Sequence, residues 1–390
     1  MIRVCHIITQ LELGGAQKIA LYTAQHLDRS RFSAQIIAGP GGMLDEEARD
    51  LGIPFHIVPS LIRQVSPAHD LLALAQLTRL LRRMRPDVVH THSSKAGILG
   101  RWAATLAGVP HIVHSVHGFG FNPAQGRIAR RLFVSLERVT CRMATSVLVM
   151  VSQANLKTGH DLDLFDPRRA SLIRCGVPLT EFHPAAAPRP HGSPLTVGMV
   201  ACLKPQKAPL DFVAVAARVT KARPPLPPVK FVLVGDGELR PAVESAIAQA
   251  GLQGIVTLAG WRRDVPEVLR GLDVLLHTSR WEGLPLTFLE AMATGLPIVG
   301  TGVDGNLDVV EEGVTGYLLQ PGDVEGLARR CTELLRDPDG RRRMGEEARR
   351  RVLLFDVDGM VRRKELLYEG LVSGGPARAV AMSTQVDALG

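Results

Sequence analysis

Two carboxylates near residue 286 are the side chains of this sequence best suited to chemistry on a polar ligand. Glu282 lies in the loop that precedes the helical run LTFLEAMATG, and Glu290 follows eight positions later inside that run. Amides at the start of a helix can donate to phosphates or sugar hydroxyls, and a carboxylate can accept from both hydroxyls of a diol. The spacing also fits a simpler arrangement, in which Thr287, Glu290 and Thr294 form the solvated stripe of an amphipathic helix.

A glycine pair in the first half is the second candidate. Gly14 and Gly15 follow a strand-like run and open a helix, where backbone amides and the helix dipole favour an anion. The pattern lacks the GxGxxG spacing of dinucleotide-binding dehydrogenases, so that class is not supported. Taken alone, the pair fits a tight turn equally well.

Histidines concentrated in two strand-like runs raise the question of a metal site; they are His90, His92, His111, His114 and His117. The run HTHSSKAG lacks the later residues of the HxHxDH pattern of metallohydrolases. Alternation along the second strand turns His114 away from the face that His111 and His117 share. We therefore expect no metal, and structural roles for these histidines except His117.

The elements that must position these residues alternate between β-branched runs and helical patterns. Strands are predicted at 4–8, 34–39, 87–92, 111–117, 146–152 and 171–177, and again at 195–202, 229–235, 255–260, 273–279, 296–301 and 315–320. Strands joined by helices form parallel sheets. The predicted fold class is therefore α/β, with two doubly wound Rossmann-like domains facing across a cleft, and ligands are expected beyond the carboxyl ends of the strands.

The length of 390 residues agrees with two domains, and a connector rich in Pro and Ala, HPAAAPRPHGSP, separates the two sets of strands. We predict an N-terminal domain at 1–187 and a C-terminal domain at 188–352. A helix over 353–371 is expected to return to the N-terminal domain, followed by a flexible tail at 372–390.

Charge and composition exclude several classes of protein. The net charge is +8, but residues up to Arg189 hold 22 basic and 13 acidic side chains, whereas the remainder holds 24 and 25. Aromatic residues are scarce and not interleaved with basic ones, which argues against nucleic acid. Five cysteines without a CxxC pair indicate a reducing compartment. Because neither a signal peptide nor a membrane span is evident, we expect a cytoplasmic protein.

Several segments, in this order, resemble the retaining glycosyltransferases of family 4: LGGAQ, HTHSSKAGILGR, HSVHGF, RCGV, GMVACLKPQKAPLDF, LVGDGELR, LAGWRRDV and SRWEGLPLTFLEAMATGLPIV. The resemblance extends to about Gly370 and implies the GT-B fold. The HSSKAG and VHGF pieces resemble the branch that builds bacterial capsular polysaccharide, exopolysaccharide or O-antigen repeat units.

The resemblance implies roles for individual residues. Glu290 would hold the ribose of a nucleotide-sugar, and Glu282 would lie beside the transferred sugar. That sugar's hydroxyls would be bound by the backbone of Gly283, Leu284, Pro285 and Leu286. The remaining implied residues are Gly14 and Gly15 at the donor diphosphate, Trp261 and Arg262 at the nucleobase, His117 in the active site and Lys207 at the donor phosphates. Trp261 and Arg262 also fit a packing residue and a solvated face.

One position departs from the family pattern. The arginine expected five residues before Lys207 is Cys202, and a thiol cannot make the bidentate phosphate contact of a guanidinium. Lys204 is the substitute that we consider for the missing charge.

The family mechanism implies retention by attack on the face of the leaving group, with a UDP- or GDP-sugar as co-substrate and no metal or other cofactor. The DxD spacings Asp161–Asp163 and Asp356–Asp358 do not follow central strands. Two alternatives stay open: a hydrolysing sugar-nucleotide epimerase of the same fold, and a non-catalytic membrane-associated scaffold.

Two basic stretches, 77–87 and 125–143, point towards the acceptor. In the second, Ile128, Leu132, Leu136 and Val139 recur at helical spacing, flanked by arginines. Such a helix either lies on an anionic membrane or packs its apolar side and exposes a basic rim. Since acceptors in the polysaccharide branch are typically sugars on a polyprenyl diphosphate, we expect a saccharide or polyprenyl-diphosphate-linked acceptor and a peripheral position on the inner face of the cytoplasmic membrane.

Overall fold

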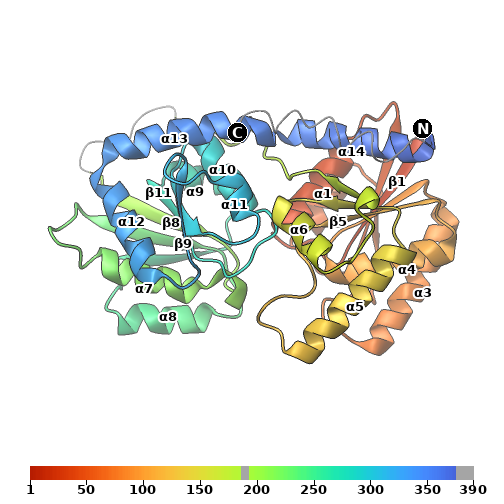
Figure 1. Cartoon of the computed structure of the whole chain (residues 1–390), viewed down its shortest axis with the longest axis horizontal. Helices are drawn as coiled ribbons and strands as arrows, with labels where there is room; N and C mark the ends of the chain where they lie inside the picture. Colours follow the sequence, from red (N-terminus) through yellow and green to blue (C-terminus); the bar gives the residue numbers. More distant parts are fainter. Residues whose placement is uncertain (186–192, 375–390) are drawn as a thin grey trace. The chain divides into compact units, whose positions relative to one another are not determined.

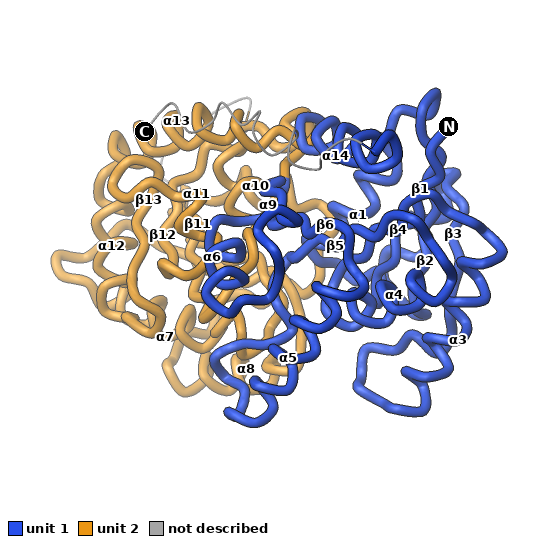
Figure 2. Tube along the Cα trace, turned by 45° about the vertical axis from the view of Figure 1, so that its right-hand side comes forward, with its two compact units in different colours: residues 1–175, 358–390 blue, residues 176–357 orange. Residues whose placement is uncertain are grey.

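The computed structural model describes residues 1–185 and 193–374, which form two compact units, each built on one sheet (Figures 1 and 2). Unit 1 contains residues 1–175 and the described residues from Asp358 onward, and unit 2 contains 176–357. The chain thus leaves unit 1 before the predicted boundary at 187. Most of the predicted connector and the predicted tail from residue 375 lie outside the described residues.

The sheet of unit 1 consists of parallel strands, and each strand run predicted for the first half overlaps one of them. Their order across the sheet is β3 (Phe55–Ile57), β2 (Phe32–Ala38), β1 (Ile2–Ile8), β4 (Val88–Thr91), β5 (His111–Val116), β6 (Val147–Met150) and β7 (Ala170–Leu172). The edge strand β3 was not predicted, because three residues are too few for a periodicity.

The helices of unit 1 lie on both faces of this sheet: α1 (Gly15–His26), α2 (Asp45–Asp50), α3 (Pro67–Met84), α4 (Ser94–Ala107), α5 (Arg127–Met143), α6 (Gln153–Asp161), the 3-10 turn η1 (Pro167–Arg169) and α14 (Val357–Val372). The last of these belongs to unit 1 from Asp358 onward and lies along α1 (Figure 1), and it begins at Val357 where the sequence suggested a helix over 353–371. The Tyr22 hydroxyl donates to Asp358 at 2.8 Å, and the Asp28 amide donates to Glu365 at 2.7 Å.

Unit 2 repeats the architecture, and all of its strands lie within predicted runs. Their order is β10 (Val256–Gly260), β9 (Val229–Val234), β8 (Leu195–Val200), β11 (Val274–His277), β12 (Ile298–Thr301) and β13 (Gly316–Leu319). The helical elements are η2 (Pro205–Lys207), α7 (Pro209–Val219), α8 (Arg240–Gln249), α9 (Val265–Arg270), α10 (Leu286–Thr294), α11 (Asn306–Val309), α12 (Val324–Arg336), α13 (Pro338–Val352) and η3 (Leu353–Phe355). Phe212 of α7 and Phe231 of β9 meet edge to face in the core.

Both sheets reverse their strand order at one point, which lies between β1 and β4 in unit 1 and between β8 and β11 in unit 2. The loops that leave the two strands there diverge to opposite faces, so the carboxyl edge of the sheet is open to a ligand at this point. The residues singled out from the sequence should therefore be sought beside these four strands.

The pairing of β1 with β4 explains a feature of unit 1 that composition alone does not show. His6 lies opposite His90 in this pairing. Because side chains alternate along a strand, Cys5, Ile7 and Val89 face the core beneath α3 and α4, whereas His6 and His90 face the side that α1 and α14 cover.

Candidate functional site

Two loops at the carboxyl edge of the unit 2 sheet are hydrogen-bonded to each other. One follows β8 and ends in η2, and the other joins β11 to α10. The Thr278 hydroxyl donates to the carbonyls of Lys207 at 3.0 Å and Ala208 at 2.9 Å, and the Arg280 amide donates to the Gln206 carbonyl at 2.7 Å. Since β8 and β11 are neighbours at the strand-order reversal, these bonds bring the side chains of both loops together there.

Lys207 and Glu282 form an ion pair at this junction. The Lys207 Nζ lies 2.5 Å from the Glu282 Oε1, and the two side chains are 20% and 5% exposed. The Ser279 hydroxyl donates to the same oxygen at 2.6 Å. Burial raises the pKa of Glu282, but the charge of Lys207 and the hydrogen bonds from Lys207 and Ser279 outweigh it, so the pKa lies below its ordinary value. Glu282 is therefore a carboxylate that accepts hydrogen bonds and has no proton to give.

His277, the last residue of β11, is a buried neutral imidazole next to this pair. Its ring meets Phe288 edge to face, with centroids 5.2 Å apart, and its Nδ1 lies 3.1 Å from the Ser279 hydroxyl oxygen. Burial and the Lys207 charge lower the pKa of His277 to about 4, although Glu282 opposes them. Because Ser279 donates to Glu282, its oxygen is free to accept from the His277 Nδ1–H. The chain His277–Ser279–Glu282 thus orients the carboxylate.

Helix α10 begins four residues after Glu282, with Pro285 at its N-cap. Proline supplies no side-chain acceptor to the first amides, which leaves them available to a ligand. Glu290 and Thr294 are only 6% and 5% exposed. The alternative in which Thr287, Glu290 and Thr294 form a solvated stripe is therefore wrong, because the helix is buried from Phe288 to Thr294. Glu290 is a buried carboxylate that belongs to the same loop-and-helix segment.

The loop that carries Glu282 is held from its far side. The Glu282 amide donates to Asp304 at 2.8 Å, and Asp304 itself has the left-handed backbone conformation, with φ of 40°. A Cβ on Gly305 would lie 1.9 Å from the Gly283 carbonyl oxygen. Only glycine permits this approach between the two loops, so the position of Gly283 depends on the absence of a side chain at Gly305.

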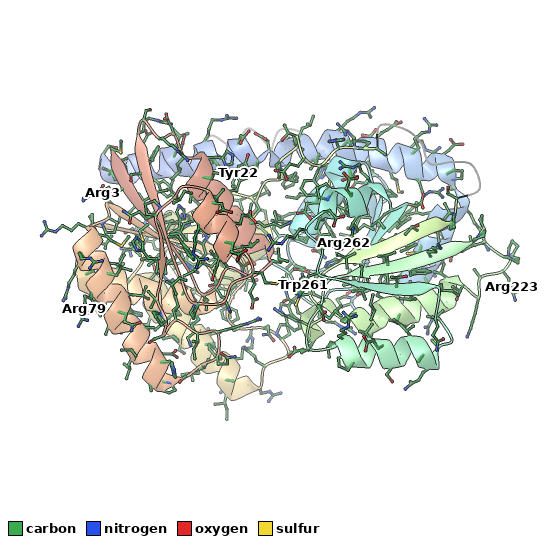
Figure 3. All side chains as sticks on the ribbon, turned by 180° about the vertical axis from the view of Figure 1, so that it is seen from behind. Arg3, Tyr22, Arg79, Arg223, Trp261 and Arg262 are labelled. Atoms are coloured by element: carbon green, nitrogen blue, oxygen red, sulfur yellow. The ribbon has the colours of Figure 1, made fainter. Side chains whose placement is uncertain are left out.

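The other implied donor residues of unit 2 lie further apart. Trp261, 39% exposed, and Arg262 are labelled in Figure 3 and follow β10. Because β10 is the edge strand, β9 and β8 lie between it and β11. Arg262 already forms an ion pair with Asp264. Lys204 precedes η2, and its carbonyl accepts from the Lys207 amide at 2.9 Å. Cys202 is half-exposed in the same loop, so residues 202–207 follow β8 as one segment.

Gly14, Gly15 and His117 belong to unit 1. Gly14 is the N-cap of α1 and Gly15 its first residue, and the cap supplies no side-chain acceptor to the amides that follow. His117 follows β5 and is half-buried. Its Nε2 lies 3.2 Å from the Nδ1 of His92, and its Nδ1 lies 4.0 Å from the Cys175 sulfur.

His117 is the outer member of a buried histidine cluster, which we define as His6, His90, His92 and His117. The Nδ1 of His6 lies 3.1 Å from the Nε2 of His92, and the rings of His90 and His92 stack with centroids 4.4 Å apart. His90 contacts the Tyr368 hydroxyl at 2.5 Å and the Ser115 hydroxyl at 2.8 Å. As expected from the alternation, His114 points elsewhere and bonds Thr91.

The cluster meets one geometric condition for a metal site, because ligand atoms of His6, His90 and His92 lie within 4.8 Å of one another. The chemistry of the donor set fits a cation poorly. Both nitrogens of His90 and both of His92 are in hydrogen bonds, and the positive charge of Lys364 acts on all three rings. The cluster is better described as a hydrogen-bonded network.

The two DxD spacings do not form a carboxylate pair. Asp161 binds Lys157 and Asp163 binds Arg142, at the end of α6. Asp356 and Asp358 fall in different units. Neither pair follows a central strand, as the sequence predicted.

Helix α5 carries an exposed apolar stripe. Ile128, Leu132, Leu136, Val139 and Met143 are 86%, 67%, 40%, 45% and 68% exposed. At about 100° per residue they fall within an arc of about 80°. The opposite face is buried and is anchored by an ion pair of 2.7 Å between Glu137 and Arg101 of α4. The alternative considered from the sequence, in which α5 packs its apolar side against the protein and exposes a basic rim, is therefore wrong.

Arginines flank this stripe on one side. Arg138 and Arg142 are bound to the α6 end, at the carbonyls of Leu162 and Asp163. Arg127, Arg130 and Arg131 are exposed, and within the described part of the chain they form no ion pair. In residues 1–185 and 193–374, no helix has the length and apolar character needed to cross a membrane.

Several residues of these sites were not predicted. Thr278, Ser279 and Asp304 orient Glu282, and His6, Lys364 and Tyr368 complete the histidine cluster. The position of His6 in a central strand next to His90 and His92 was a usable signal, because neighbouring parallel strands align their side chains. Asp304 and Tyr368 gave no such signal, since their roles depend on tertiary packing.

Comparison with known proteins agrees with this architecture. A family model described as "Glycosyl transferases group 1" matches residues 184–351, and one described as "Glycosyl transferase 4-like domain" matches residues 14–176. The UDP-Gal:alpha-D-GlcNAc-diphosphoundecaprenol alpha-1,3-galactosyltransferase of Escherichia coli is 34% identical over 333 residues, which cover 83% of this chain and 85% of the relative. The GDP-mannose-dependent alpha-mannosyltransferase of Mycobacterium tuberculosis is 30% identical over 336 residues, covering 80% and 82%.

Solved structures share the fold at low sequence identity. Anabaena Alr3699/HepE in complex with UDP and glucose matches with a TM-score of 0.80 at 20% identity, covering 95% of this chain and all of that one. Sucrose-phosphate synthase of Thermosynechococcus elongatus matches with a TM-score of 0.81 at 18% identity and covers 96% of this chain.

Proposed function

The chain belongs to the family 4 glycosyltransferases of the GT-B fold, and we propose that it moves a sugar from a UDP- or GDP-sugar to a saccharide carried on polyprenyl diphosphate. The observation that carries the proposal is the Lys207–Glu282 pair beside the uncapped start of α10. The name of the Escherichia coli relative describes a sugar on diphosphoundecaprenol as acceptor and supports the choice of acceptor.

In the proposed mechanism the protein stabilises the departing diphosphate. Lys207 and the first amides of α10 supply positive charge and hydrogen-bond donors, and Gly14 and Gly15 add the amides of α1. Cys202 brings no charge at the position where the family has arginine, and we assign the missing positive charge at the donor phosphates to Lys204.

Glu282 is suited to binding sugar hydroxyls, because its low pKa and its orientation by Ser279 keep it an acceptor. It is not suited to general acid catalysis, and its pairing with Lys207 weakens it as a nucleophile. We therefore propose a retaining transfer in which the acceptor attacks from the leaving-group side and the diphosphate takes the acceptor proton. Glu290 would hold the ribose, Trp261 and Arg262 would lie at the nucleobase, and no metal is required.

Helix α5 supports a peripheral membrane location, on the inner face of the cytoplasmic membrane, where a polyprenyl-linked acceptor is presented. Its exposed apolar stripe would enter the interface, while Arg131, the exposed arginine that borders the stripe, would reach anionic headgroups. This location suits a role in cell-surface polysaccharide synthesis, for which the sugar–lipid acceptor is the building block.

The test combines donor binding with transfer. A thermal-shift panel of UDP, GDP and their sugars should give a shift of several degrees for one base only, because a ligand that binds only the folded state stabilises it. With that donor and GlcNAc on undecaprenyl diphosphate, a new glycolipid should form with the anomeric configuration of the donor. Epimer formation from nucleotide-sugar alone would instead support the epimerase, and no shift with any nucleotide would support the scaffold.

A further inference from the structure

The hydrogen bonds of the histidine cluster restrict where its protons lie. A neutral imidazole has one donor and one acceptor nitrogen, so each of the contacts His6–His92 and His92–His117 needs a donor on one side only. His92 takes part in both contacts with different nitrogens. The protons must therefore all point the same way along the chain, either from His6 towards His117 or in reverse.

The environment of His6 selects between these two directions. Its Nε2 is buried and is the end of the chain, with no hydrogen-bond partner in the described part of the protein. If the protons pointed towards His6, this nitrogen would carry a buried N–H without an acceptor. The cost of that unsatisfied N–H places the His6 proton on Nδ1, from which it donates to His92.

The rings are also fixed in position. His92 stacks on His90, which is held at both nitrogens by Tyr368 of α14 and Ser115 of β5. Lys364 is buried, donates to the Thr23 hydroxyl at 2.8 Å, and lies on the same helix as Tyr368. Burial lowers the pKa of Lys364 to about 8, which still leaves it mostly charged at neutral pH. Helix α14 therefore supplies both the clamp on His90 and a buried cation that helps to keep the rings neutral.

We propose that His6 and His92 are positioning residues that hold His117 as the neutral tautomer with its proton on Nδ1. His92 Nδ1–H then donates to the His117 Nε2, and the His117 Nδ1–H points away from the cluster. Its neighbour there is the Cys175 sulfur at 4.0 Å, a weak acceptor that a ligand oxygen can replace. The inference rests on the proposed function only in taking that ligand to be part of a sugar substrate.

In this arrangement His117 acts as a hydrogen-bond donor and not as a base. Burial and the Lys364 charge lower its pKa to about 3, so the ring stays neutral across the working pH range. With Nε2 occupied by His92, no lone pair faces the ligand. The acceptor proton must then leave by another route, which agrees with its transfer to the departing diphosphate.

The primary test is read without donor or acceptor, so its outcome is independent of the proposed transfer. The full chain, labelled with 15N-histidine and dialysed against a chelator, is examined by long-range 1H–15N correlation at pH 7.5. The His117 signals, identified by their loss in His117→Gln, should show a protonated Nδ1 and an unprotonated Nε2. The Nε2–H tautomer, an average of both tautomers, or a doubly protonated ring would each overturn the proposal. One equivalent of zinc bound to the unmodified protein and absent from His6→Asn would also overturn it.

Variants test the role of the hydrogen-bonded histidines His6, His92 and His117. Asn can donate from nearly the place of Nδ1, so His6→Asn should keep the His117 spectrum, whereas His6→Leu should give an averaged one. With an active assay, His6→Leu should lower kcat about tenfold or more and change the donor KM by less than about twofold, and His6→Asn should recover most of kcat. His111→Asn, outside the hydrogen-bonded histidines, should leave the His117 spectrum unchanged. An unchanged His117 spectrum in His6→Leu would overturn the proposal.

Discussion

The Lys207 ammonium lies 2.5 Å from the Glu282 carboxylate, although 75 residues separate them in the sequence. The two residues follow β8 and β11, and the Thr278 hydroxyl holds the carbonyl of Lys207 in place. Without a ligand, the cation at the start of α10 is therefore balanced by a carboxylate. In the proposed mechanism a diphosphate would compete with Glu282 for Lys207, and Glu282 would then be able to turn towards a hydroxyl of the sugar.

Lys207→Ala tests the role of this cation. We expect kcat at saturating donor to fall by about 10²–10³-fold, because charge that develops on the diphosphate loses its compensating group. Lys230→Ala, at an exposed position of β9, is the matched control and should leave kcat unchanged. Near-normal turnover of Lys207→Ala in steady-state assays would show that the diphosphate is stabilised elsewhere.

Gly305→Ala tests the packing of the Glu282 loop. The added methyl group would lie 1.9 Å from the Gly283 carbonyl oxygen, so the loop must move. We expect a loss of stability of about 1–3 kcal/mol, measured by urea unfolding, and weaker donor binding in thermal-shift titrations. At Gly302 the nearest contacts of a Cβ are 3.5 Å or longer, so Gly302→Ala should be nearly silent. Equal effects of the two substitutions would contradict this account of the loop.

Acid should destabilise unit 1. His6 and His117 have pKa values lowered to about 3, first by burial and then by Lys364. Once unfolded they bind protons near pH 6.5, so the unfolded state holds more protons between these values, and the free energy of unfolding falls as the pH falls. Each histidine contributes up to about 1.4 kcal/mol per pH unit.

The measurement uses urea unfolding at pH 7.5 and 5.5, followed by Trp102 of unit 1 in a chain with Trp261→Phe and Trp281→Phe. Trp102 is then the only tryptophan. The unfolding midpoint should be clearly lower at pH 5.5. Equal midpoints at the two pH values would mean that these histidines are already protonated in the folded state or are not buried there.

Helix α5 predicts salt-dependent binding to anionic vesicles. Ile128→Ser with Leu132→Ser should weaken binding to phosphatidylglycerol vesicles at least tenfold in sedimentation assays, because two apolar side chains no longer enter the interface. The matched control, Leu353→Ser with Leu354→Ser, changes two exposed leucines of η3 and should bind like the unmodified protein. Binding that ignores salt, or that both double variants reduce equally, would argue against α5 as the contact.

The anchor of α5 should contribute more to stability than its surface charges. Glu137→Ala leaves Arg101, which is fully buried, without its carboxylate, and we expect a loss of about 3–5 kcal/mol in the free energy of unfolding. Asp163→Ala breaks the exposed pair with Arg142 and should cost about 1 kcal/mol or less. Similar losses in the two variants would mean that water reaches Arg101.

Periodicity predicted every strand of the two sheets except β3, because buried parallel strands are apolar runs between turn residues. It also indicated the segment from Glu282 to Glu290, since loops and helix starts at the carboxyl edge bind ligands. It did not settle whether Glu290 and Leu132 are buried or exposed, because an amphipathic stripe does not state which face meets the protein. It also missed Asp304 and Lys364, whose contacts join segments that are distant in the sequence.

The return of α14 to unit 1 has a consequence for biosynthesis. The strands that carry His6, His90 and His92 leave the ribosome before the whole of unit 2, whereas Lys364 and Tyr368 follow it. At about 5–20 residues per second, synthesis from His117 to Tyr368 takes roughly 13 to 50 s, during which the nascent histidine cluster lacks its cover. Unit 2 can fold co-translationally in one piece, but unit 1 closes only after α14 has left the ribosome.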